Sequence, residues 1–283
     1  MSLADQDAWA GRKRFVDTGN VRTTYVDVEG TEPALLLIHG FTDSSRSFSL
    51  LAPHLAGSRL IIPDLRGHGA SLTSEERFGV ADFADDIAGL IRTLGLERVV
   101  LVGHSLGAMV AIATAARHPE LHCGLALLAG TLRPDMPDDH AIPLGVGALR
   151  DPISPSDPFY AYWHDCRPTV PPSFLARLAE EASQMPAMRW RAILHELRGA
   201  DLTEAARQIT GTAPLIVAGE SDPLFGDPHL QALMRAFPSA TVVRLDSCGH
   251  NVHWEEPALV AAAIKSRFRP GEPSAMGMPL AKS

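Results

Sequence analysis

The chain has 283 residues, of which 46% are hydrophobic and 20% charged, and its formal net charge is -8 at pH 7. These values are typical of a soluble globular protein with one large domain, with or without an inserted subdomain, and the scattered basic residues argue against nucleic-acid binding. No apolar run is long enough to cross a bilayer, and the first residues lack the apolar core of a secretory signal.

Eight short apolar or β-branched runs are predicted to be strands. The first two, residues 14–17 and 23–28, are separated by a Gly19-Asn20 turn signal and are expected to pair antiparallel at a sheet edge. The other six are residues 34–38, 59–62, 98–102, 125–128, 214–218 and 241–245. Most of these runs are continuously apolar, which is typical of a sheet that is covered on both faces.

Helical segments are predicted between these strands. In residues 80–94 the apolar positions form one stripe, and Gly95 follows in the position of a helix C-cap. Further segments with helical patterns are residues 47–55, 108–117, 229–236 and 258–268. Because strands and helices alternate, the sequence predicts an α/β fold with an eight-stranded, mostly parallel sheet and helices on both faces.

Residues 133–211, here called the inserted segment, interrupt this alternation between two core strands. Their first part is rich in proline, and residues 174–209 are mostly helical in pattern. We predict that the inserted segment forms a helical lid, or cap, over the C-terminal edge of the sheet; the alternative is a pair of long loops with one ordinary helix. The α/β core is then predicted to comprise residues 14–132 and 212–268. The termini, residues 1–13 and 270–283, are predicted to be flexible.

A strand-turn-helix motif carries the candidate nucleophile. Residues 103–107 read Gly-His-Ser-Leu-Gly and lie between an apolar strand and an alanine-rich helical segment. Glycines on both sides of Ser105 remove the Cβ atoms that would collide in so sharp a turn. Such a turn exposes the serine hydroxyl above the sheet, beside the N-terminus of the next helix. The motif therefore predicts a nucleophilic serine.

A serine hydroxyl needs a general base, and ligands in open α/β sheets bind beyond the carboxyl ends of the strands. His250 follows the last predicted strand and is therefore the candidate base, with His253 as the local alternative. Gly249, directly before His250, would let this loop approach closely.

The base in turn needs an acid that orients its ring and stabilises the imidazolium. Asp222 stands directly after the strand at residues 214–218 and is the candidate. Glu220 is the nearest alternative, and Asp246 is expected to cap or pair locally. The predicted triad is therefore Ser105, Asp222 and His250.

Acyl transfer also needs fixed donors for the oxyanion. The backbone N–H groups of Leu106, directly after the nucleophile, and of Phe41, after Gly40, are predicted to supply them. His39 is expected to make a structural hydrogen bond within this turn. The glycine-containing motif at residues 64–71 follows a strand and is predicted to be a structural turn at the rim of the site.

The three cysteines are widely separated and lack metal-ligand spacing; they are Cys123, Cys166 and Cys248. Reduced thiols in a cytoplasmic protein are the expectation. No metal or organic cofactor is expected.

With these motifs in view, the chain resembles the α/β-hydrolase superfamily, specifically the serine hydrolases with a helical cap. The resemblance covers residues 14–268, and the order of nucleophile, acid and histidine is that of the family. It rests on five motifs, which are His39-Gly40-Phe41, Asp64 to Ser71, Gly103 to Gly107, Gly219 to Asp222, and Gly249-His250.

The resemblance implies a serine hydrolase that cleaves a small carboxylic ester or lactone through an acyl-enzyme on Ser105. Similar proteins include cofactor-free haloperoxidases (perhydrolases) and carbon–carbon bond hydrolases, so these reactions remain alternatives. Carbon–carbon hydrolases usually have Asn and Gly where this chain has His104 and Ala108. Haloalkane dehalogenases and epoxide hydrolases use aspartate in place of Ser105. A non-catalytic ligand-binding protein on the same scaffold is a further alternative.

Substrate size and shape should depend on the inserted segment. The candidate pocket residues are His104, Phe159, Tyr160 and Trp163. For the aromatic residues, Tyr162 among them, the alternative is that they pack the core of the lid itself.

Overall fold

The computed structural model describes residues 5–19 and 21–268, so the predicted flexible tail at residues 270–283 lies outside the described chain. The strands are β1 (Lys13–Asp17), β2 (Val21–Val28), β3 (Thr31–Ile38), β4 (Ser58–Pro63), β5 (Leu72–Thr73), β6 (Val99–His104), β7 (His122–Leu128), β8 (Leu215–Gly219) and β9 (Thr241–Leu245). The α-helices are α1 (Val80–Thr93), α2 (Leu106–Arg117), α3 (Ala141–Ala148), α4 (Pro158–Trp163), α5 (Pro172–Ser183), α6 (Ala187–Gly199), α7 (Thr203–Gln208), α8 (Asp227–Ala236), α9 (Val252–Glu255) and α10 (Pro257–Arg267). Short 3-10 helices are η1 (Ala10–Arg12), η2 (Ser45–Phe48), η3 (Ala52–Leu55) and η4 (Pro119–Leu121).

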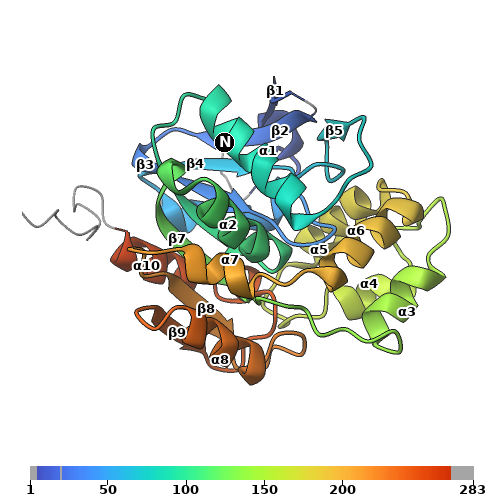
Figure 1. The fold of residues 1–283 in the computed structure, drawn as a ribbon. Helices are drawn as coiled ribbons and strands as arrows, with labels where there is room; N and C mark the ends of the chain where they lie inside the picture. The colour runs from blue at the N-terminus through green and yellow to red at the C-terminus, as the bar shows by residue number, and fades with distance from the viewer. Residues whose placement is uncertain (1–4, 20, 269–283) are drawn as a thin grey trace, which may run out of the picture.

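One sheet forms the centre of the described structure, with the strand order β1-β2-β4-β3-β6-β7-β8-β9 and with β5 paired to β2 (Figure 1). The strands from β4 to β9 along this order pair in parallel, whereas the pairs β1–β2, β2–β4 and β2–β5 are antiparallel. The mostly parallel sheet and its antiparallel edge pair are therefore confirmed. The predicted count of eight strands is wrong, because β5 makes the described sheet nine-stranded. Its two residues are too few to show a hydrophobic period.

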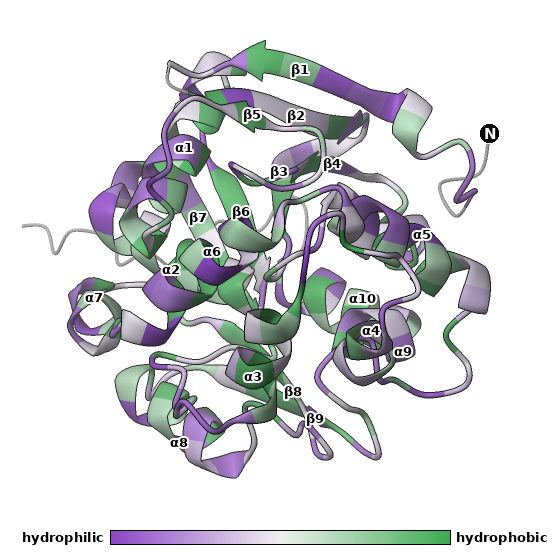
Figure 2. Ribbon diagram, turned by 90° about the vertical axis from the view of Figure 1, so that its right-hand side faces the viewer, coloured by the Kyte–Doolittle hydropathy of each residue, from purple (hydrophilic) through white to green (hydrophobic). Residues whose placement is uncertain are grey.

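Successive residues of the central strands point into two different hydrophobic cores. In β3, Leu36 and Ile38 pack in the core that contains α1 and α2, whereas Leu35 and Leu37 pack in the core that contains η3 and α10. Figure 2 shows the central strands β6 and β7 as largely hydrophobic, while outer helices such as α1 and α8 mix hydrophilic and hydrophobic residues. The sheet is thus covered on both faces, as the apolar runs predict. None of the described helices is both long and apolar enough to cross a membrane.

The inserted segment contains the five helices α3 to α7, between β7 and β8. Figure 1 shows α3 to α6, from green to gold, gathered beside one end of the sheet. The helices α3 and α4 lie in the proline-rich part, where no helix is predicted. The α4 helix has a readable signal, because Asp157 accepts a hydrogen bond from the Phe159 N–H and Pro158 occupies the first helical position. Residues 47–55 form η2 and η3 instead of the predicted helix.

The N-terminal segment is anchored by two buried residues, Ala8 and Trp9, which corrects the expectation of a flexible terminus at this point of residues 5–13. The Trp9 side chain is completely buried in one core with Phe48 and Leu51. Its indole N–H donates to the Ser45 hydroxyl at 3.3 Å. A single tryptophan in an otherwise polar segment shows no periodicity, so the local pattern gives no sign of this contact.

We expect Trp9→Ala to lower the free energy of unfolding by about 3–5 kcal/mol, because it leaves a large cavity in a close-packed core. Denaturant unfolding measures the change. The matched control is Phe15→Ala in β1, where the side chain is 61% exposed, and its effect should stay below about 1 kcal/mol. Equal effects of the two substitutions would show that the N-terminal segment does not pack as described.

Candidate active site

Ser105 sits at the crossing between β6 and α2, in a backbone conformation that few side chains adopt. Its φ is 52° and its ψ is -115°. A Cβ on Gly103 would lie 2.1 Å from the carbonyl oxygen of Gly107, and a Cβ on Gly107 would lie 2.0 Å from that of Ile38. Both glycines are therefore required by direct backbone contact, and the strained turn is held by the strands around it.

The structure brings the predicted acid and base together. His250 Nδ1 lies 2.9 Å from Asp222 Oδ2, and Asp222 Oδ1 accepts hydrogen bonds from the N–H groups of Leu224 and Phe225 at 2.8 and 3.0 Å. Burial alone would raise the pKa of Asp222, but His250 and these two amides outweigh burial and lower it. The carboxylate therefore stays ionised and orients the imidazole ring.

The opposite side of the His250 ring faces the candidate nucleophile's cavity. His250 Nε2 is buried and makes no hydrogen bond to any described residue. His250 and Ser105 line the same cavity. Such a buried, unpartnered ring nitrogen is available to take a proton in the reaction.

The alternative candidates for the acid and the base do not line the cavity that contains Ser105. Glu220 is on the surface, 3.7 Å from Arg244, and Asp246 is also exposed. His253 is fully buried, and its Nε2 contacts the Ser47 hydroxyl at 2.9 Å. It does not line the cavity that contains Ser105.

The two predicted oxyanion donors belong to segments that meet at Ser105. Leu106 is the first residue of α2, so its N–H is among those that an α-helix leaves without an internal partner. Phe41 lines the cavity from the loop after β3. A Cβ on Gly40 would lie 3.0 Å from His104 Nδ1 and 3.4 Å from Ser105 Cβ, so this glycine allows the close approach of the loop.

His39 and the turn at residues 64–71 are structural, as predicted. His39 donates from Nδ1 to the Gly40 carbonyl at 2.8 Å and accepts at Nε2 from the Leu65 N–H at 2.9 Å. Burial is the main reason that the pKa of His39 is lowered to about 4. Asp64 receives hydrogen bonds from Lys13 Nζ and from the N–H groups of Ser45 and Ala70, at 2.7 to 2.8 Å. The neutral His39 ring and the paired Asp64 carboxylate therefore both hold the surrounding loops in place.

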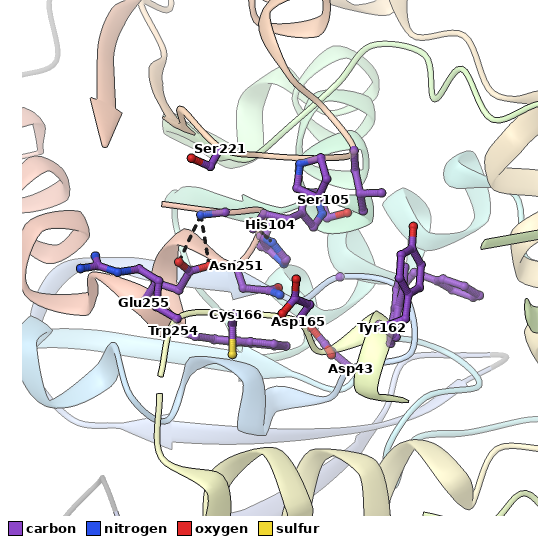
Figure 3. Close-up of a pocket in the computed structure, with 18 of the residues that line it drawn as sticks. Asp43, His104, Ser105, Tyr162, Asp165, Cys166, Ser221, Asn251, Trp254 and Glu255 are labelled. Carbon is purple, nitrogen blue, oxygen red and sulfur yellow. Dashed lines mark hydrogen bonds between the residues drawn. The ribbon is translucent and has the colours of Figure 1, made fainter. Parts of the chain in front are cut away.

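The cavity has a volume of about 390 Å³ and contains part of the predicted pocket set (Figure 3). His104 and Trp163 line it, whereas Phe159 and Tyr160 do not, which corrects that part of the prediction. Both of these rings pack against Trp190, which is completely buried, so they belong to the core of the inserted segment. Tyr162 lines the cavity and is 46% exposed.

His104 links the nucleophile strand to the histidine loop. Its Nε2–H donates to the backbone carbonyl of His250 at 3.1 Å, and its ring lies 4.2 Å from that of His253. Burial, followed by the charge of His250, lowers the pKa of His104 to about 3. The residue is therefore a neutral hydrogen-bond donor that positions the backbone of the candidate base.

Three carboxyl groups that line the cavity, those of Asp43, Asp165 and Glu255, are not predicted from the sequence. Glu255 accepts hydrogen bonds from the Gly249 N–H at 3.2 and 3.1 Å, which Figure 3 shows as dashed lines, and so anchors the loop before His250. Asp43 accepts a hydrogen bond from the Ser47 hydroxyl at 2.9 Å. Burial raises the pKa of Asp43 to about 7.

Sequence comparison places this geometry in a known group of proteins. The profile of the alpha/beta hydrolase family matches residues 35–263. The chain belongs to the alpha/beta hydrolase family. Its mostly parallel sheet with helices on both faces is therefore an alpha/beta hydrolase fold.

Several relatives of this alpha/beta hydrolase match over most of its length. It is 33% identical over 260 residues to the 2-(acetamidomethylene)succinate hydrolase of Mesorhizobium japonicum, covering 89% of this chain and 93% of that protein. It is 32% identical over 248 residues to the lipase LipV of Mycobacterium tuberculosis, covering 83% and 93%. The malate-bound structure of a thermophilic esterase from Thermogutta terrifontis superposes with a TM-score of 0.76 at 25% identity, covering 90% and 97% of the two chains.

The cysteines of this hydrolase are free thiols. Burial raises the pKa of Cys166 to about 11 and that of Cys248 to about 12, so neither is activated as a nucleophile. Within residues 5–19 and 21–268, no group of three or more His, Cys, Asp or Glu side chains is arranged to hold a metal ion.

We expect Asp43→Asn to stabilise this hydrolase above pH 7. The pKa of Asp43 rises from 3.8 to about 7 on folding, so the folded protein keeps a proton that the unfolded chain releases between these values. The stabilising contribution of the protonated Asp43 side chain therefore falls as the pH rises through this window and is lost above pH 7. The substitution should raise the free energy of unfolding by about 1 kcal/mol or more at pH 8.5, and this increase should be smaller at pH 5.

Thermal or denaturant unfolding at the two pH values tests this prediction. The matched control is Asp64→Asn, which removes the partner of Lys13 and of two backbone amides and should destabilise at both pH values. A loss of stability in Asp43→Asn at pH 8.5 would contradict the prediction.

Proposed function

We propose that this alpha/beta hydrolase cleaves a small carboxylic ester or lactone through an acyl-enzyme on Ser105. The observation that carries the proposal is the buried His250–Asp222 pair, with a 2.9 Å contact and a free Nε2, at the cavity that Ser105 lines. A hydroxyl is a weak nucleophile at neutral pH, and a base oriented by a carboxylate activates it.

In the first half-reaction His250 Nε2 takes the Ser105 proton while Oγ attacks the acyl carbon. The carbonyl oxygen becomes an oxyanion, which the N–H groups of Phe41 and Leu106 stabilise. His250, now protonated and paired with Asp222, gives its proton to the departing alkoxide oxygen. The C–O bond breaks and the acyl group remains on Ser105.

In the second half-reaction water takes the place of the alcohol. His250 accepts a proton from the water as its oxygen attacks the acyl-enzyme, and the same two amides stabilise the second oxyanion. The proton returns to Ser105 Oγ as the acid departs. The two half-reactions use His250 as the base twice and require only residues of this chain and water.

We further propose that the inserted segment is a lid that shapes the substrate site. Trp163 of α4 donates its indole N–H to the Thr42 hydroxyl at 2.9 Å, and its ring packs on Phe41. Trp190 of α6 packs on Phe41 from another direction. These contacts couple the lid to the loop that holds one oxyanion donor and support a role in substrate positioning.

The names of relatives support hydrolysis of acyl compounds but differ in substrate. One is a 2-(acetamidomethylene)succinate hydrolase, another a lipase, and a similar structure is an esterase. For this reason the substrate class is best argued from the cavity of this chain.

The central test is hydrolysis of a panel of acyl esters and lactones by the wild-type protein and by Ser105→Ala. We expect the substitution to lower kcat at least about 10³-fold with little change in stability, because it removes the attacking atom. Ser183→Ala is the matched control, a hydroxyl deletion in α5 where the side chain donates to the Glu180 carbonyl outside the cavity lining, and it should retain full activity. Near-wild-type turnover by Ser105→Ala, or no turnover of any substrate by the wild-type protein, would refute the proposed function.

A further inference from the structure

The cavity of this hydrolase is lined by more carboxyl groups than cationic groups. Its described lining includes the acids Asp43, Asp165 and Glu255 and a single guanidinium, that of Arg167. Arg167 is already paired with Glu256, which lies outside the lining. The cavity therefore offers no unpaired Lys or Arg side chain, among the described residues that line it, to receive a substrate carboxylate.

Asp43 and Glu255 are the buried members of this acidic set, and Asp43 is held in one orientation. Its Oδ2 accepts the Ser47 hydroxyl proton at 2.9 Å. The same hydroxyl oxygen is contacted by Trp254 Nε1, which can only donate, at 3.1 Å and by His253 Nε2 at 2.9 Å. Since the single Ser47 proton goes to Asp43, His253 must donate to the hydroxyl oxygen as well. The network thus presents Asp43 as a fixed acceptor.

A comparison with Asp64 shows that Asp43 lacks the partners of a structural acid. Both side chains are almost completely buried. Asp64 receives one ammonium and two backbone N–H groups, and these hold its pKa below the usual value despite burial. Asp43 receives one neutral hydroxyl and makes no ion pair with a described Lys or Arg, and burial raises its pKa. The charge of His250 lowers the pKa of Asp43 but is outweighed by burial. A buried acid that lacks a Lys or Arg partner and lines a ligand cavity is a candidate binding residue.

One oxygen of Asp43 remains open for a ligand. Oδ1 receives no hydrogen bond from the described residues, whereas Oδ2 is engaged by Ser47. Asp43 also follows Phe41 by two residues, and Thr42 between them has a φ of 68° and is held by Trp163. The carboxyl group therefore belongs to the same rigid loop as one proposed oxyanion donor.

We infer that Asp43 is a substrate-binding residue that selects esters or lactones with a hydroxyl or ammonium group near the scissile bond and disfavours those with a carboxylate. The inference rests on the proposed function and adds the substrate class. The open oxygen accepts the substrate's donor hydrogen, while its negative charge and those of the neighbouring acids repel an anion. Hydrogen bonds to charged groups are stronger than neutral ones, so discrimination of about tenfold is expected.

Three methyl esters of matched chain length test the selection: methyl butanoate, methyl 3-hydroxybutanoate and monomethyl succinate. Their kcat/KM values at pH 8.5 are compared for the wild-type protein, Asp43→Asn and Asp138→Asn. Asp43→Asn keeps an oxygen that can accept from Ser47 but removes the charge. Asp138 is a surface acid, 97% exposed and paired with Arg198, and serves as the matched control.

We expect the wild-type protein to prefer the hydroxy ester to methyl butanoate by about tenfold and to disfavour the succinate ester by about tenfold. Asp43→Asn should reduce both ratios at least about threefold, and Asp138→Asn should leave both unchanged. Wild-type ratios near one would overturn the inference without use of any variant. Unchanged ratios in a folded Asp43→Asn protein would also overturn it.

The two proposals fail in different ways. If the wild-type protein cleaves all three esters equally and Ser105→Ala cleaves none, the hydrolytic function stands and the role of Asp43 is refuted. If the wild-type protein cleaves no ester, activated aryl esters included, the proposed function is refuted and the inference about Asp43 with it.

Discussion

Three backbone segments touch one another directly beneath Ser105, and this contact constrains the whole site. The end of β6, the first turn of α2 and the end of β3 approach so closely that a single Cβ on Gly103 or Gly107 would lie about 2 Å from a carbonyl oxygen. Because the strands on either side are buried in two cores, the turn cannot relax away from this contact. The strained φ of Ser105 is therefore a consequence of packing on both faces of the sheet.

Neutral, buried histidines connect the loops that extend from these strands. His39 joins the loop after β3 to the turn after β4, and His104 joins the end of β6 to the backbone of His250. Burial is the largest cause of the lowered pKa of each, so both remain uncharged at neutral pH. One ring accepts and the other donates the connecting hydrogen bond, and neither adds a charge beside the candidate base.

The sequence predicts those features that depend on neighbouring residues in the chain. Buried parallel strands are continuous apolar runs, and Ser105, Asp222 and His250 each follow a strand end, so their approach to one edge of the sheet is predictable. The helix α4 also carries a local signal, the capping residue Asp157. By contrast, Trp9 and Ser45 are far apart in sequence, and nothing local indicates that they touch.

The same distinction applies to the cavity. Phe159, Tyr160, Tyr162 and Trp163 belong to one short helix, and its orientation decides which rings face the cavity. That orientation depends on Trp190 and Phe41, which belong to other elements. Asp43 is likewise distinguished by its tertiary surroundings, because no Lys or Arg of the described residues pairs with its buried carboxyl group. The shape of the pocket and the lack of a charged partner depend on tertiary contacts. The spacing of residues along the chain therefore does not predict them.

The central claim is that Ser105 is a nucleophile activated by the His250–Asp222 pair. Reaction of the folded protein with a fluorophosphonate, followed by peptide mass spectrometry, tests it most directly. The account predicts one covalent adduct per chain, located on Ser105, with the rate of labelling strongly reduced in His250→Gln. An unlabelled protein, an adduct on another residue, or an unchanged rate in His250→Gln would contradict it.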